Sequence, residues 1–74
     1  MSLAQALALH RAGRRREARA LYERALRQRP DDLQARFAYG LCLLEDGNLA
    51  DGIAAMRLLV AARPDHAGAH QALG

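Results

Sequence analysis

The glycines and prolines of this chain recur at a fixed interval of 34 residues. Gly13 aligns with Gly47, and Pro30 aligns with Pro64, when the sequence is shifted by that interval. Glycine favours tight turns, whereas proline ends helices and keeps the residue before it out of the helical region. A repeat of this length is typical of stacked helical hairpins, in which each unit buries its apolar face against the next.

The composition predicts an all-α chain. Apolar residues make up 51% of the 74 residues, and most of them are alanine and leucine, which are strong helix formers. Strand-favouring residues are rare, because the chain has one valine, one isoleucine and no threonine. A chain of this length forms one small domain with a modest core.

The turn and stop residues predict where the helices lie. We expect helices near residues 2–12, 15–28, 32–45, 49–62 and 66–73. Each glycine turn joins two antiparallel helices, and each proline separates one hairpin from the next. Asp31, Asp32 and Asp65 follow the prolines, and we expect them to act as N-caps because aspartate accepts hydrogen bonds from the first helical N–H groups.

Apolar residues recur at helical spacing in the second helix of each hairpin. The stripe in 15–28 consists of Ala18, Leu21, Tyr22, Ala25 and Leu26. The stripe in 49–62 consists of Leu49, Ile53, Met56 and Val60. Small residues occupy the positions where neighbouring helices must approach closely, namely Ala6, Ala18, Gly40 and Gly52.

This pattern resembles the tetratricopeptide repeat family, whose period is also 34 residues. The motif residues are Tyr39-Gly40-x2-Leu43, Leu73-Gly74, Ala18-x3-Tyr22, Gly52-x3-Met56, Pro30 and Pro64. The large aromatic residue that opens the family pattern is replaced by Ser2, Arg36 and His70. The resemblance implies a right-handed α-α superhelix in one domain, with repeats at 1–32 and 33–66 and a partial repeat at 67–74.

The resemblance also implies a concave groove lined by the first helix of each hairpin, where the family binds peptides or protein segments. The matching positions are Leu3, Leu7, His10, Gln34, Phe37, Leu41 and Leu44. Family members that clamp a terminal carboxylate use lysine and asparagine there, and apolar residues replace them in this chain. An apolar groove suits an amphipathic helix or an apolar peptide.

Basic charge is carried by arginine alone and is concentrated in the first hairpin. Residues 1–29 hold eight of the 11 arginines and only two acids. The cluster includes Arg11, Arg14, Arg15 and Arg16, and the last three stand at the start of helix 15–28, where positive charge opposes the helix dipole. We predict a solvated basic edge that can contact an acidic partner; nucleic acid is a weaker alternative, because no aromatic residues interleave with the arginines.

Catalytic and metal-binding patterns are scarce. Phosphate-loop and Schiff-base chemistry need residues that are missing, because the chain has no lysine and no threonine. Cys42 lies among leucines and is expected to be a buried thiol. His66 and His70 share a helix face but lack a third metal ligand, so we expect them to be surface histidines. We therefore predict no catalytic residues, no metal and no cofactor.

The remaining predictions concern location and assembly. We see no signal peptide and no membrane-length apolar run, which favours a cytoplasmic location without membrane contact. The outer side of helix 49–62 carries Ala54, Leu58 and Ala61, so copies are expected to associate through it and the segment 66–74, unless the chain is a fragment of a longer stack. Three functions remain open: a protein-binding scaffold, a self-associating module, or an N-terminal accessory fragment of a larger bacterial enzyme.

Overall fold

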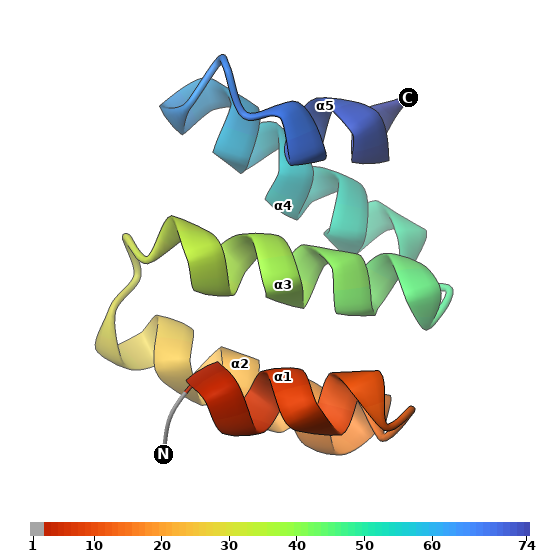
Figure 1. Cartoon of the computed structure of the whole chain (residues 1–74). Helices are drawn as coiled ribbons and strands as arrows, with labels where there is room; N and C mark the ends of the chain where they lie inside the picture. The colour runs from red at the N-terminus through yellow and green to blue at the C-terminus, as the bar shows by residue number, and fades with distance from the viewer. Residues whose placement is uncertain (1–2) are drawn as a thin grey trace.

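The computed structural model describes residues 3–74, and within that range it contains helices and no strand (Figure 1). The helices are α1 (Leu3–Arg11), α2 (Arg15–Gln28), α3 (Leu33–Glu45), α4 (Leu49–Ala62) and α5 (Ala67–Leu73). They confirm the predicted all-α fold and the five predicted segments, apart from residue 2, which lies outside the described range. None of these helices is long and apolar enough to cross a membrane.

The helices form two antiparallel hairpins followed by a single helix. α1 packs against α2, and α3 packs against α4, while α5 folds back onto α4. α3 lies in the middle of the molecule and contacts every other helix (Figure 1). α3 therefore separates the first hairpin from the α4–α5 pair, and a surface that spans both must include α3.

Each hairpin turn is closed by a glycine with a positive φ angle. Gly13 has φ +82° and Gly47 has φ +83°, a region that residues with a side chain rarely adopt. The N–H of Arg14 donates to the carbonyl of Leu9 at 2.9 Å, and the Gly13 N–H donates to the carbonyl of His10 at 3.1 Å. This pair of bonds is the Schellman motif, which satisfies the last carbonyls of a helix and stops it. The second turn repeats it.

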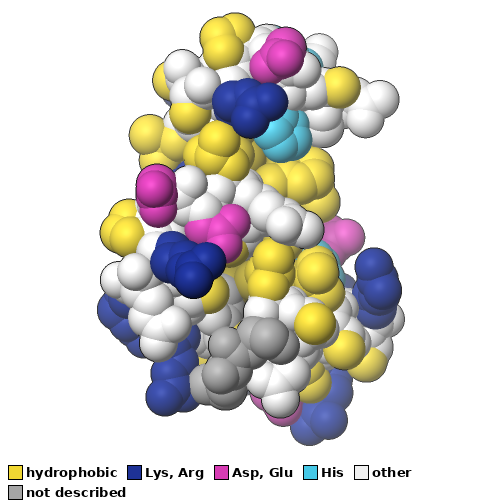
Figure 2. All heavy atoms as spheres, turned by 60° about the vertical axis from the view of Figure 1, so that its left-hand side comes forward, with side chains coloured by type: hydrophobic (Ala, Val, Ile, Leu, Met, Phe, Trp, Pro, Cys, Tyr) yellow, Lys and Arg dark blue, Asp and Glu magenta, His cyan; other side chains and the backbone are white. Residues whose placement is uncertain are grey.

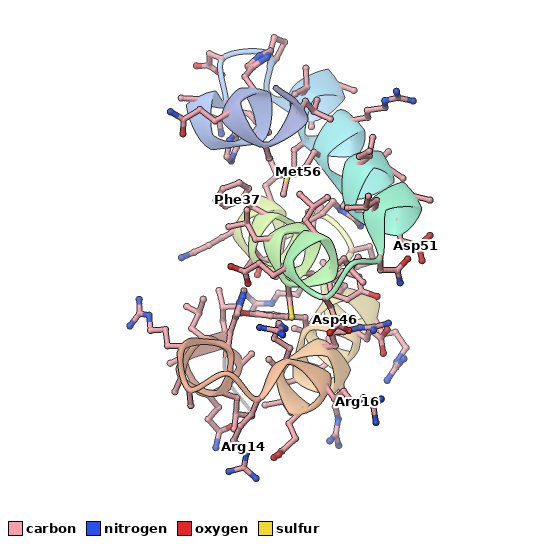
Figure 3. All side chains as sticks on the ribbon, turned by 90° about the vertical axis from the view of Figure 1, so that its right-hand side faces the viewer. Arg14, Arg16, Phe37, Asp46, Asp51 and Met56 are labelled. Atoms are coloured by element: carbon pink, nitrogen blue, oxygen red, sulfur yellow. The ribbon has the colours of Figure 1, made fainter. Side chains whose placement is uncertain are left out.

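The buried side chains form two clusters, one on each side of α3. The first consists of Ala6, Ala18, Tyr22, Ala38 and Cys42. The second consists of Met56, Leu59 and Ala69, with Leu33, Phe37, Leu41, Leu44, Val60 and Ala72 packed against them. Figure 3 shows Phe37 and Met56 directed into the space between α3 and the last two helices. α3 thus carries side chains of both cores.

Small residues set the closest helix contacts, as predicted. A Cβ atom added at Gly52 would lie 2.7 Å from the side chain of Leu44, so α4 approaches α3 more closely than an alanine there would allow. The predicted apolar stripe of α4 is wrong at Leu49, which does not lie on the buried face of the helix. Leu49 is 58% exposed, because the buried face is centred on Gly52, Met56 and Leu59 rather than on Leu49.

Of the three predicted N-caps, Asp32 is confirmed, whereas Asp31 and Asp65 are wrong. Asp32 caps α3, where its Oδ1 accepts a hydrogen bond from the Ala35 N–H at 3.1 Å. Asp65 lies one residue too early in the repeat to reach the corresponding N–H. His66 stands at the position equivalent to Asp32, and its Nδ1 accepts the hydrogen bond from the Ala69 N–H at 3.1 Å.

Candidate binding groove

A groove of about 660 Å³ runs between α1 and α3. Its lining residues are Leu7, His10, Arg11, Gly13, Arg15, Gln34, Phe37, Ala38, Leu41 and Glu45. Five of the seven residues predicted for a groove are brought together here: Leu7, His10, Gln34, Phe37 and Leu41. Its size falls within the usual range for sites that bind small molecules or short segments.

The apolar part of the groove lies where the two core clusters meet. Leu7 packs against the first cluster, and Phe37 and Leu41 pack against the second. Each of these side chains is half-buried, so one side supports the core and the other faces the groove. Ala38 also lines the groove, although the sequence analysis did not single it out.

Two predicted groove residues lie elsewhere. Leu3 packs against the first core cluster, and Leu44 packs against the second, where it covers Gly52. Neither belongs to the groove lining. Their side chains fill the spaces between neighbouring helices, which is the other role open to apolar residues of a first helix.

A hydrogen-bonded group of three side chains closes one end of the groove. His10 Nδ1 lies 3.1 Å from the Tyr22 hydroxyl, and His10 Nε2 pairs with the Glu45 carboxylate. The three residues come from α1, α2 and α3, so the group ties the first hairpin to the middle helix. Burial, and then the nearby Cys42 and Glu45 charges, raise the pKa of Tyr22 to about 12. Tyr22 is fully buried and remains a neutral phenol.

The predicted arginine cluster divides into separate groups. Arg11 and Arg15 line the groove, while Arg14 pairs with Glu17 at 2.6 Å on the outside of α2. Arg15 Nε lies 3.6 Å from Asp46 and is buried without a hydrogen-bond partner. Arg16 points away into solvent and makes no ion pair within residues 3–74 (Figure 3).

One contact between the hairpins was not predicted from the sequence. Asp46 follows α3 and accepts a hydrogen bond from Arg19 at 3.2 Å, in addition to its longer ion pair with Arg15. Figure 3 shows Asp46 between the end of α3 and α2. Part of the basic charge is therefore balanced internally. Figure 2 shows more basic side chains over α1 and α2 than over α4 and α5.

A second hollow continues from the groove along α3. It has a volume of about 350 Å³ and is lined by Leu33, Gln34, Phe37, Arg63, Asp65 and His66. Gln34 and Phe37 belong to both hollows. Phe37 therefore stands at the junction of an extended surface that reaches from the first hairpin to the loop before α5.

The predicted self-association residues share one outward face of α4. Leu58 is 55% exposed, and Ala54 and Ala61 beside it are also exposed. Arg57 is the charged residue on this part of the helix. The described part of the chain leaves this apolar face uncovered.

Cys42, His66 and His70 each form a hydrogen bond with a backbone group. The Cys42 thiol is fully buried and donates a weak hydrogen bond to the Arg15 carbonyl at 3.6 Å, and burial raises the pKa of this thiol. His66 and His70 bond to backbone groups rather than only to solvent. Within residues 3–74, no three metal-ligating side chains gather.

The comparison with known families agrees with this architecture. A family model described as "Tetratricopeptide repeat" matches residues 3–67, which is most of the chain. No curated protein and no solved structure matches the sequence.

Proposed function

The chain belongs to the tetratricopeptide repeat family, and from this membership we propose that it binds a segment of a partner protein in the groove between α1 and α3. Membership supports a general role as a scaffold for protein–protein interaction, and repeats of this family are typically not catalytic. The observation that carries the proposal is the placement of Leu7, Phe37 and Leu41 on one continuous hollow surface.

The groove favours a partner segment that combines apolar and acidic side chains. Leu7, Phe37 and Leu41 provide apolar contacts, and they suit an amphipathic helix or an apolar peptide. Arg11 lines this groove and pairs with no acid within residues 3–74, whereas Arg15 is paired with Asp46. Arg11 therefore offers a positive charge that attracts a carboxylate and makes binding sensitive to salt.

A second candidate function is self-association through the outer face of α4. The observation that favours it is the exposure of Leu58 between Ala54 and Ala61. Such a face loses contact with water when a second copy covers it, and symmetric dimers use the same patch on both subunits.

The remaining expectations follow from the proposed role. A binding scaffold needs no catalytic residue, metal or cofactor, and we expect none. A cytoplasmic location, and a place as an N-terminal accessory part of a larger bacterial enzyme, stay predictions. In either setting, the groove between α1 and α3 would present the same residues.

Selection from a random peptide library displayed on phage tests the groove. The selected peptides are then measured by calorimetry against the wild type and Phe37→Ala. We expect affinity to fall at least about tenfold, or about 1.4 kcal/mol, because Phe37 lines both hollows. Arg11→Gln should weaken the acidic peptides among them and reduce the salt dependence of their binding.

Val60→Ala is the matched control, because Val60 packs against the same core cluster as Phe37 but does not line the groove. This variant controls for loss of core packing and should keep the affinity. Selected peptides that bind the wild type and Phe37→Ala equally well would contradict a role for the groove.

A further inference from the structure

Two histidines hold the connection between α4 and α5. His66 Nδ1 accepts a hydrogen bond from the Ala69 N–H at 3.1 Å and so caps α5. His70 Nε2 lies 2.6 Å from the carbonyl oxygen of Pro64, so it donates a hydrogen bond back to the loop. The two side chains thus bind one backbone N–H group, that of Ala69, and one backbone carbonyl, that of Pro64, on either side of the start of α5.

In the connection between α2 and α3, different side chains bind the backbone groups at the equivalent positions of the repeat. Asp32 accepts from the Ala35 N–H at 3.1 Å, and Arg36 donates to the carbonyl oxygen of Pro30 at 3.0 Å. Aspartate and arginine keep their charges throughout the neutral and mildly acidic range, whereas histidine changes its charge there. The two connections share a backbone design, but only the second is held by histidines.

We propose that His66 is a pH-sensitive cap that releases the start of α5 when it is protonated. An imidazole accepts a hydrogen bond at Nδ1 only in the neutral tautomer that carries its proton on Nε2. Protonation turns Nδ1 into a donor, which then faces the Ala69 N–H, another donor. It also places a positive charge at the N-terminus of a helix, where the helix dipole opposes it.

The neighbours of His66 carry little unscreened charge, so its hydrogen bond with the Ala69 N–H is the interaction that protonation changes. In the hollow that His66 lines, α3 contributes Leu33, Gln34 and Phe37, none of which is charged. The loop contributes Arg63 and Asp65, which pair with each other at 3.7 Å and are well exposed, so their opposing effects on His66 are screened. His70, on α5, donates from Nε2 in either charge state and keeps its bond to Pro64.

Release of α5 would reach the groove through Phe37. The rings of Phe37 and His66 lie 4.9 Å apart between centroids. Phe37 also rests on Gly68 of α5, where an added Cβ would lie 2.7 Å from the ring. Phe37 thus packs against two residues at the start of α5. Loss of the cap removes that support from a wall shared by both hollows.

The effect on partner binding rests on the proposed function of the groove, whereas the switch itself does not. The two are tested by separate measurements, so that one can fail while the other holds. Nuclear magnetic resonance follows the switch in the free chain, and peptide affinity follows the groove.

The switch is tested by titrating the free chain between about pH 7.5 and about pH 5, across the range where histidine changes charge. We expect the Ala69 amide resonance to move together with the ring protons of His66, and the amides of α5 to exchange faster at the acidic end. Ring protons of His66 that titrate while the Ala69 amide and the exchange of α5 stay unchanged would overturn the proposal.

Variants at the two equivalent caps give a reciprocal test. His66→Asp should make the exchange of α5 insensitive to pH in this range, because aspartate stays ionised, and His66→Asn serves if the first variant folds poorly. Asp32→His should transfer the acid sensitivity to α3. Retention of the pH response in His66→Asp and His66→Asn would assign it to His10 or His70 and overturn the role of His66.

The groove is tested with a peptide whose binding depends on Phe37, selected as described above. Its affinity should fall several-fold between about pH 7.5 and about pH 5.5 for the wild type, and stay nearly constant for His66→Asp. Equal losses in both proteins would overturn the link from α5 to the groove. A failure to select any such peptide would count against the groove and leave the resonance test of the cap to stand alone.

Discussion

The two hairpins share one backbone plan but differ at their centres. Tyr22 of α2 and Met56 of α4 stand 34 residues apart, and both are fully buried. Tyr22 joins a polar group with His10 and Glu45, whereas Met56 lies in a wholly apolar cluster and reaches across to Gly40. The same position in the repeat therefore links three helices by hydrogen bonds in one hairpin and fills space in the other.

The outer faces differ in the same way. Arg16 and Arg27 of α2 correspond to Ala50 and Ala61 of α4, so the first hairpin presents charge where the second presents an apolar surface. The shared positions are those that shape the backbone, namely the turn glycines, the prolines and the small residues at helix contacts. The repeat thus sets the fold, and the residues that vary between repeats decide what each hairpin contacts.

Replacing the buried Tyr22 or Met56 by alanine has the largest expected effect on stability. Tyr22→Ala should lower the free energy of unfolding by about 4 kcal/mol, since it empties a buried aromatic site. It also removes the hydroxyl partner of His10 Nδ1. Met56→Ala should cost about 3 kcal/mol, because methionine is smaller and leaves no polar group behind. Urea denaturation followed by circular dichroism measures both.

Tyr22→Phe separates the polar part of this difference from the packing part. It keeps the ring and should cost about 1 kcal/mol, the usual value of one hydrogen bond. A larger loss for Met56→Ala than for Tyr22→Ala would show that the apolar cluster, rather than the polar group, dominates the stability of the chain.

Alkaline pH should weaken the first hairpin before the second. Burial, followed by the charges of Cys42 and Glu45, raises the pKa of Tyr22 from 10.0 to about 12. The folded chain therefore holds the phenol proton more tightly than the unfolded chain does. The resulting stability is complete below about pH 10 and is lost as the pH rises through about 12, and it amounts to about 3 kcal/mol in all.

Two further groups of α3, which lie in or against the first core cluster, act in the same direction. Burial also raises the pKa of Tyr39, with help from its hydrogen bond to Glu23, and burial raises the pKa of Cys42. The buried cluster of the second hairpin and α5 holds no titrating side chain, since it consists of Met56, Leu59 and Ala69. Thermal melts from about pH 9 to about pH 12 should show the loss, and Tyr22→Phe should reduce it. A loss that Tyr22→Phe leaves unchanged would assign the effect to the other two groups.

The sequence predicts the fold well because the residues that fix it act locally. Gly13 and Gly47 need a positive φ angle, and Pro30 and Pro64 exclude helix continuation, so their spacing places the helix ends. The groove residues Leu7, His10, Gln34, Phe37 and Leu41 were expected from the resemblance to the family, which places a binding surface on the first helix of each hairpin.

The remaining features depend on contacts that local patterns do not encode. Leu49 fits an apolar stripe, but the close approach at Gly52 turns α4 so that Leu49 is exposed. Asp46 meets Arg15 and Arg19 only after α2 and α3 have packed. The capping role of His66 could have been found by shifting Asp32 by one repeat, but the residue type pointed instead to its aspartate neighbour.

The smallest expected change in stability accompanies the largest expected change in assembly. Leu58→Glu places a charge in the middle of the outer face of α4, where Leu58 is 55% exposed. Because the side chain makes few contacts within the folded chain, the free energy of unfolding should change by no more than about 0.5 kcal/mol. If copies associate through this face, sedimentation should show dimers or larger species for the wild type and monomers for the variant.

Leu49→Glu is the matched control for this experiment. Leu49 is 58% exposed and lies on the same helix, but on a different side from Ala54 and Ala61. It changes the net charge and the exposed apolar area in the same way as Leu58→Glu, so a general effect of charge on solubility would appear in both variants. Dissociation by Leu58→Glu alone would assign the interface to the outer face of α4. A wild-type chain that sediments as a monomer at the highest attainable concentration would contradict self-association, and the apolar face would then be an ordinary exposed surface of the second hairpin.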